Sequence, residues 1–162
     1  MEGGYYFEAN PSASADWKVI PYLGRTLSGV ALMPYTGGVE GASLTDKMAL
    51  PENVSEVNVH VVVKSTLAFH DVKGHEYTVG FDGGKETVVN FNADLNEESE
   101  NVYSVFYPTV ARRVVEKTVT LTVPPSTDGM QLLPLKPLDP GIVFEKIVVD
   151  CGGYQKSYIF MD

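Results

Sequence analysis

The side chains with the most capacity for chemistry in this chain are three histidines, one cysteine and 21 carboxylates. His60 lies in an alternating stretch, and His70 and His75 follow it five residues apart. This spacing is compatible with a metal cluster, but a solvated surface is the interpretation that we favour. Cys151 has no second cysteine with which to form a disulfide. A lone thiol after a core strand is most often a small buried residue, not a nucleophile.

The short motifs of catalysis are absent from the sequence. There is no G-x-S-x-G, no H-E-x-x-H, no phosphate-binding loop and no cysteine pair. The carboxylates show no acid/base pattern, although glycosidase carboxylates come from distant parts of a fold and their spacing cannot exclude them. The aromatic residues could include a sugar-stacking platform, but most aromatic side chains of a β-sandwich belong to its core. We expect Trp17, the single tryptophan, to be buried and structural.

Charge and composition limit the classes of partner. The formal net charge is −9. Phosphate binding needs a basic face, and anionic lipids attract basic segments, so neither nucleic acid nor a membrane surface is expected as a partner. The 162 residues, 44% of them hydrophobic, fit one domain with a full core. We therefore expect residues 1–162 to form a single domain.

Hydrophobic alternation predicts most of the strands. Residues 56–64 place four valines on one face, and residues 113–123 alternate in the same way. Residues 77–81 and 86–91 flank Asp-Gly-Gly-Lys and predict a hairpin. Residues 142–150 are apolar on both faces, which is typical of a central strand.

The remaining segments give weaker signals. Residues 44–50 fit an edge strand, and two prolines place residues 131–138 at an edge too. Residues 103–107 form a short aromatic segment after a solvated loop, and no long amphipathic helix is evident. Eight to ten short strands separated by turns predict an all-β fold, an antiparallel β-sandwich that is jelly-roll-like.

Four stretches of the sequence carry a resemblance to a known family. They are YYFEAN, DWKVIPYLGRTLSGVALMP, YTVGFDGGKETVVNFN and LDPGIVFEKIVVDCGGYQKSY. In this order they resemble the C-terminal β-sandwich domain of glycoside hydrolase family 115, the xylan α-glucuronidases. Residues 95–131 match only loosely.

The resemblance implies an excised accessory domain of a larger glycosidase. In that family the catalytic machinery lies on a separate barrel, and nothing in this chain alternates strand and helix as a barrel must. The implied role is non-catalytic: packing against upstream catalytic domains of the parent chain, with contacts to a second copy in a dimer. The parent would act on glucuronoxylan and be periplasmic or secreted. The alternative is a carbohydrate-binding module that grips xylan or a related polysaccharide.

A second likeness concerns a metal. Residues 7–10 and 149–150 are similar to the ends of family 6 and family 35 carbohydrate-binding modules, jelly rolls that hold a structural calcium between first and last strands. This likeness implies Glu8, Asn10 and Asp150 as oxygen ligands of calcium. The alternative is that Glu8 and Asp150 cap strand ends in solvent. The calcium hypothesis requires the strand of residues 5–9 to lie beside that of residues 142–150.

Three features separate these functions. A large exposed apolar patch would favour a packing domain, because it would be an uncovered interface. Exposed coplanar aromatic rings beside a cleft would favour a carbohydrate-binding module. Two facing carboxylates in a deep pocket would indicate an enzyme.

Overall fold

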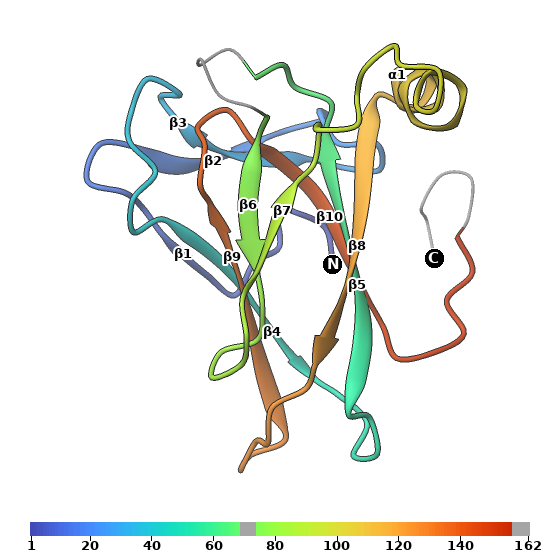
Figure 1. Cartoon of the computed structure of the whole chain (residues 1–162). Helices are drawn as coiled ribbons and strands as arrows, with labels where there is room; N and C mark the ends of the chain where they lie inside the picture. The colour runs from blue at the N-terminus through green and yellow to red at the C-terminus, as the bar shows by residue number, and fades with distance from the viewer. Residues whose placement is uncertain (69–73, 157–162) are drawn as a thin grey trace.

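Two antiparallel sheets face one another across a hydrophobic core in the computed structural model, which describes residues 1–68 and 74–156 (Figure 1). The β9 sheet, named after its central strand, has the order β1 (Glu8–Asn10), β4 (Ser43–Ala49), β9 (Met130–Pro137), β6 (Glu76–Val79) and β7 (Thr87–Asn90). The β10 sheet has the order β2 (Asp16–Ile20), β3 (Gly29–Met33), β10 (Val143–Asp150), β5 (Glu56–Lys64) and β8 (Val114–Thr122). The antiparallel β-sandwich expected from the sequence is confirmed.

The strands with the clearest patterns form as predicted. β10 is the central strand of its sheet and pairs with β3 and β5. β5 and β8 pair over their whole lengths, and the four alternating valines of β5 are all buried in the core. β6 and β7 form the predicted hairpin. Burial of alternate residues is clearest along residues 57–61 of β5, as the sequence pattern predicted.

Aromatic rings join the two sheets at the middle of the core. The ring centroids of Tyr77 on β6 and Phe144 on β10 lie 5.5 Å apart at 82°, an edge-to-face contact. Phe91 lies 6.3 Å from Tyr77, and all three side chains are fully buried. Trp17 is mainly buried, as predicted, and packs against the core; its Nε1–H donates to the Asn10 carbonyl at 2.8 Å, which is a structural role.

The two predicted edge strands lie inside the β9 sheet, so that expectation was wrong. β9 can be central because each proline stands beyond the end of one of its two ladders: β4 pairs with β9 only up to Leu135, and β6 pairs with it only from Leu135 onward. The Leu138 N–H donates to the Glu76 carbonyl on β6. Because backbone N–H groups alternate in direction along a strand, the nitrogen of Pro134 also faces the β6 side, and that of Pro137 faces the β4 side. At each of these places the neighbouring ladder has already ended, so the missing N–H of the proline costs no ladder hydrogen bond.

The prediction that the first and last strands pair is also wrong. β1 pairs with β4 in the β9 sheet, with Ala9 opposite Leu44, so that both side chains face the core. The segment beside β10 is instead residues 1–3: the Gly3 N–H donates to the Glu145 carbonyl at 2.6 Å. A Cβ on Gly3 would come within 2.5 Å of a β10 carbonyl oxygen, so this close approach requires glycine.

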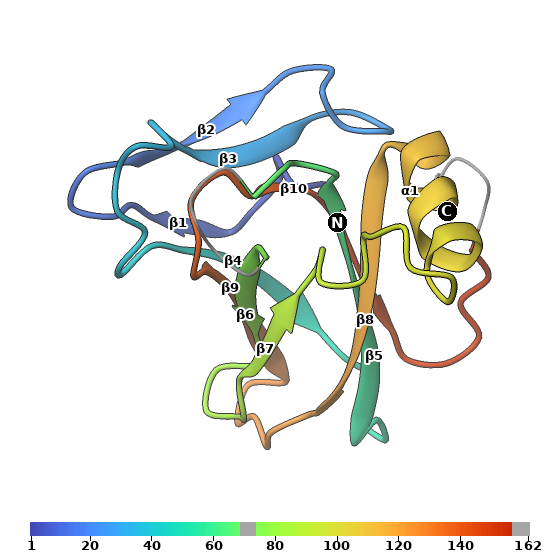
Figure 2. The same ribbon diagram turned by 45° about the horizontal axis from the view of Figure 1, so that its top comes forward.

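A helical segment stands outside both sheets, next to β8 (Figure 2). It consists of one π-helical turn, η1 (Val102–Phe106), followed by α1 (Tyr107–Arg112). No helix was predicted here, because the segment has no fully buried face and its sequence therefore lacks an amphipathic pattern. Arg113 ends α1 in the left-handed conformation, with φ 61°.

Candidate functional site

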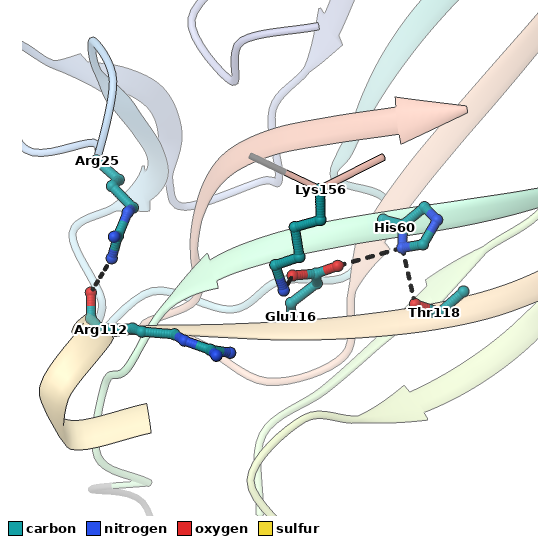
Figure 3. Close-up of polar contacts among 6 residues, drawn as sticks. All are labelled: Arg25, His60, Arg112, Glu116, Thr118 and Lys156. Carbon is teal, nitrogen blue, oxygen red and sulfur yellow. Dashed lines mark hydrogen bonds and ion pairs between the residues drawn. The ribbon is translucent and has the colours of Figure 1, made fainter. Parts of the chain in front are cut away.

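A polar cluster occupies the outer face of the β10 sheet (Figure 3). Glu116 on β8 accepts from Lys156 in the C-terminal segment, and its Oε1 lies 3.2 Å from His60 Nδ1 on β5. Thr118 Oγ1 lies 2.9 Å from the same histidine nitrogen. The ring centroids of His60 and Tyr154 are 5.0 Å apart. These contacts fasten residues 154–156 across the sheet.

His60 is less solvated than the sequence suggested. It lies on the outward face of β5 as predicted, but its side chain is only 16% exposed. Its Nε2 is buried without a hydrogen-bond partner among the described residues. A single imidazole flanked by one carboxylate and one hydroxyl makes no metal site, and no group of three or more His, Cys, Asp or Glu side chains in the described residues is arranged to hold a metal ion.

A polar hollow of about 290 Å³ lies beside this cluster, between α1 and β8. Its charged lining comprises Asp94, Arg112, Glu116, Lys117 and Lys156. The two lysines are each paired with a carboxylate: Lys117 Nζ lies 2.7 Å from Asp94. Positive and negative charges nearly balance, so the hollow offers hydrogen bonds but little net potential for an ionic ligand.

Two carboxylates are buried in the sandwich. Glu145, at the bulge of β10, is 2% exposed and accepts from the Arg25 backbone N–H at 2.8 Å, with Lys64 Nζ 3.6 Å from its other oxygen. Burial raises the pKa of this carboxyl, while the Arg25 hydrogen bond and Lys64 oppose the rise. Glu145 therefore ties the turn after β2 and the end of β5 to the central strand, which is a structural role.

Asp46 on β4 is the second buried carboxylate. It shares the inward face of the strand with Leu44 and is 6% exposed. Burial raises its pKa to about 6, against the opposing attraction of the Met1 amino group. Asp46 and Glu145 come from different sheets, and neither lines the hollow described above or those at residues 39–43, at Phe7, at Met1 and behind Val110. They do not make a facing pair in a pocket, as a glycosidase requires.

The helical segment carries a group of exposed apolar side chains. Tyr103, Tyr107 and Val110 are 80%, 53% and 58% exposed, and none of the residues of η1 or α1 is buried. The rings of Tyr103 and Tyr107 lie 5.7 Å apart, on one side of the segment. Behind Val110, a hollow of about 470 Å³ is lined mainly by apolar groups, including Leu95 and Phe106.

The residues predicted to bind calcium are separated by the strand order. Glu8 and Asn10 lie on β1 in one sheet, and Asp150 ends β10 in the other. Asn10 Nδ2 donates to Ser43 Oγ at 3.3 Å, and Asp150 Oδ1 accepts from the backbone of the following turn. A calcium site formed by Glu8, Asn10 and Asp150 stays a prediction, without the strand pairing on which it was built. A thermal melt with and without excess chelator tests it; an unchanged melting temperature would reject it.

Other reactive residues differ from expectation. His75 is fully buried against Phe91, not solvated. Cys151 is exposed, not buried, because the chain leaves the sheet directly after β10. His70 lies outside the described residues. Sequence reasoning missed Asp46, because the strand that carries it has only a weak hydrophobic pattern, and its inward charge was the only signal. No helix in the described residues is long and apolar enough to cross a membrane.

The family model for the glycosyl hydrolase family 115 C-terminal domain matches residues 1–161. The chain belongs to this family. The resemblance inferred from the four sequence stretches is thus confirmed over nearly the whole chain, and the family-115 chain is expected to be one part of a glycoside hydrolase. No curated protein matches it.

Solved structures show the same fold. The family-115 chain superposes on a family GH115 4-O-methyl-α-glucuronidase, BtGH115A, whose specificity is for decorated arabinogalactans, with a TM-score of 0.63 and 17% identity over 90% of this chain. It spans only 17% of that enzyme's length. A C-terminal family 6 carbohydrate-binding module of LamC, a laminarinase from Zobellia galactanivorans, gives a TM-score of 0.56 at 10% identity, covering 93% of this chain and 96% of the module.

A second family 6 module, from Cellvibrio mixtus lichenase 5A in complex with cellotriose, gives a TM-score of 0.53 at 9% identity, covering 93% of this chain and 94% of the module. At these identities the likenesses show the fold alone. The family-115 chain thus shares its β-sandwich fold with these two modules.

Proposed function

We propose that the chain is a single, non-catalytic accessory domain of a family 115 α-glucuronidase that acts on glucuronoxylan. Its task is to pack against the catalytic part of the parent chain, through the surface formed by Tyr103, Tyr107 and Val110. This exposed surface, on a helical segment without a fully buried residue, is the observation that carries the proposal.

The physical argument rests on the cost of exposing apolar surface. Each large apolar side chain that remains in water forgoes about 1.5–3 kcal/mol of burial free energy. A surface helix normally turns such residues toward its own core. Tyr103 and Tyr107 face away from it instead, and neither has a described partner other than rings of the same segment. A surface of this kind is stable in a soluble enzyme when another domain covers it.

The occupant we assign is the remainder of the parent chain. The similar family 115 enzyme is far longer than this domain, which spans 17% of it, so a covering domain is available without any second molecule. A second copy in a dimer, implied by the family resemblance, is the alternative occupant.

Hydrogen exchange tests this assignment. Amides 102–112 are compared between the isolated chain and the full-length parent, with the exposed Tyr22 region as an internal control. Protection of residues 102–112 in the parent alone supports the proposal. Equal exchange in both proteins contradicts it. Concentration-dependent protection in the isolated chain, with sedimentation as a dimer, assigns the surface to a second copy instead.

The non-catalytic role has its own test. The purified chain should release no 4-O-methylglucuronic acid from glucuronoxylan above a buffer blank, since its buried carboxylates Asp46 and Glu145 do not share a pocket. Release above the blank would contradict it. The periplasmic or secreted location of the parent remains part of the proposal, and fractionation of cells that express the parent would check it.

A further inference from the structure

A second surface, separate from the helical segment, has the composition of a sugar subsite. A hollow of about 360 Å³ lies where the β6–β7 hairpin and the β8–β9 loop approach β4, at the end of the sandwich remote from α1 (Figure 1). Its lining comprises Phe7, Lys47, Asp82, the loop residues 125–128, and residues 130–132 at the start of β9.

An exposed aromatic ring forms one wall of this hollow. Phe7 is 58% exposed, yet its position is fixed by a backbone hydrogen bond from its N–H to the Thr45 carbonyl at 2.9 Å. Lys47 Nζ lies over one face of the ring, 5.2 Å from its centroid, so the other face of Phe7 is the one left for a ligand. A flat apolar face and a hydrogen-bond donor are thus adjacent, where one small ligand can touch both.

The opposite wall is a loop that its own hydrogen bonds hold in shape. Asp128 Oδ1 accepts from Ser126 Oγ at 2.8 Å and from the Met130 N–H at 3.0 Å. These two donors lower the pKa of Asp128, so this carboxylate is ionised. Gln131 Nε2 donates to the Pro124 carbonyl and closes the base of the loop. A loop ordered before binding loses little entropy when a ligand arrives.

We propose that this hollow binds one neutral pyranose unit of a glycan. The C–H face of the sugar lies on the Phe7 ring, Lys47 donates to a ring hydroxyl, and the carboxylates of Asp82 and Asp128 accept from others. Asp82 is exposed, and its backbone N–H donates to the Leu132 carbonyl, which holds the hairpin against β9.

The charges of the hollow select against acidic sugars. Asp82 and Asp128 outnumber Lys47, and the chain as a whole carries −9. A uronate would bring a third carboxylate beside these two, and like charges at close range repel. The site therefore prefers the uncharged units of a glycan to its uronic acid branches.

An NMR titration of the ¹⁵N-labelled chain tests the site, with xylotetraose, cellotetraose and sodium glucuronate as separate ligands. We expect at least one neutral tetrasaccharide to bind with a Kd of about 1–10 mM. The shift changes should concentrate at Phe7, Lys47, Asp82 and residues 125–132. Phe7→Ala should weaken binding at least ~5-fold. Tyr22→Ala, which removes a ring that is 96% exposed elsewhere, should leave the Kd unchanged.

Other results would overturn the inference. No shift change with either tetrasaccharide up to ~20 mM, shift changes confined to other surfaces, or equal Kd values for Phe7→Ala and the native chain would each reject the site. Glucuronate binding as strongly as the tetrasaccharides would reject the charge argument. Asp82→Ala, which removes an exposed carboxylate, should also weaken binding and serves as the readout if Phe7→Ala fails to fold. Because this test reads a surface remote from residues 102–112, it can fail while the proposed packing role stands.

Discussion

The interior and the helical segment use the same residue types in opposite ways. Tyr77 and Phe144 meet edge-to-face at the centre of the sandwich and are fully buried. Tyr103 and Tyr107 meet at nearly the same ring separation, 5.7 Å, but remain mostly in water. Aromatic contact alone therefore does not identify a core residue. The exposed fraction of the ring distinguishes a residue that stabilises this domain from one that is available to a partner.

The largest effect should come from the buried pair. Phe144→Ala removes a ring that touches both Tyr77 and Trp17, and we expect it to lower the free energy of unfolding by about 3–5 kcal/mol. Denaturant melts of the chain measure it. Phe7→Ala, at a ring that is 58% exposed, is the matched control and should cost much less. Equal losses of unfolding free energy in the two variants would contradict the proposed difference between buried and exposed rings.

A second expectation concerns the charge held in the interior. Because burial raises the pKa of folded Asp46 to about 6 from an ordinary value of 3.8, the folded state favours the protonated acid. Stability from this group is present below pH 4 and is lost as the pH rises from about 4 through 6. Asp46→Asn removes the titrating group. The free energy of unfolding of this variant, relative to that of the native chain, should therefore rise by about 2–3 kcal/mol between pH 4 and pH 7.

Parallel stability curves for Asp46→Asn and the native chain would show that this carboxylate is already solvated or paired in the folded state. Asp82→Asn is the control, because Asp82 is exposed. Its stability curve should run parallel to that of the native chain between pH 4 and pH 7.

The buried tyrosine should give a smaller effect, opposite in sign to that of Phe144→Ala. The Tyr77 hydroxyl is buried without a hydrogen-bond partner among the described residues, and burial raises its pKa, so it stays neutral. Tyr77→Phe removes this unpaired group and keeps the ring, so we expect a gain of about 1 kcal/mol in thermal or denaturant melts. Tyr5→Phe, at an exposed ring, should be neutral. A loss of more than about 1 kcal/mol would indicate a partner such as a bound water for the hydroxyl.

The smallest stability effect should come from the exposed pair. Replacing Tyr103 and Tyr107 together by Ser should change the stability of the isolated chain by less than about 0.5 kcal/mol, because the rings bury little in this domain. Binding of a hydrophobic dye should fall in the same variant. A stability loss comparable to that of Phe144→Ala would mean that the segment belongs to the core, and the packing surface would have to be sought elsewhere.

Sequence pattern predicted the fold where burial has a period of two. β5 needs nothing beyond its alternating valines, and β10, which is apolar on both faces, is the central strand of its sheet, between β3 and β5. The same reasoning failed for β9, where two prolines argued for an edge. Each proline nitrogen faces a side on which the neighbouring ladder has already ended. The lengths of the neighbouring strands cannot be predicted from the β9 sequence.

The candidate sites were less accessible to sequence reasoning than the fold. Glu8, Asn10 and Asp150 were grouped by assuming that the first and last strands pair, but local alternation does not select a pairing partner. The hollow at Phe7 draws on four segments that are distant along the chain. A hydrogen-bond donor, an acceptor and an aromatic face become one site only when the fold brings their segments together.

The sequence by itself therefore determined the class of fold, the central strand, the hairpin and the family of this domain, because each depends on short-range periodicity or on residues close together in the chain. Tertiary structure alone decided which strand pairs with β1, that β9 is central, that Asp46 is buried, and that Tyr103 and Tyr107 are not. The physical reason is that burial is a property of the surroundings: a side chain loses its water only through contacts with segments far away in sequence, and local pattern does not encode their position.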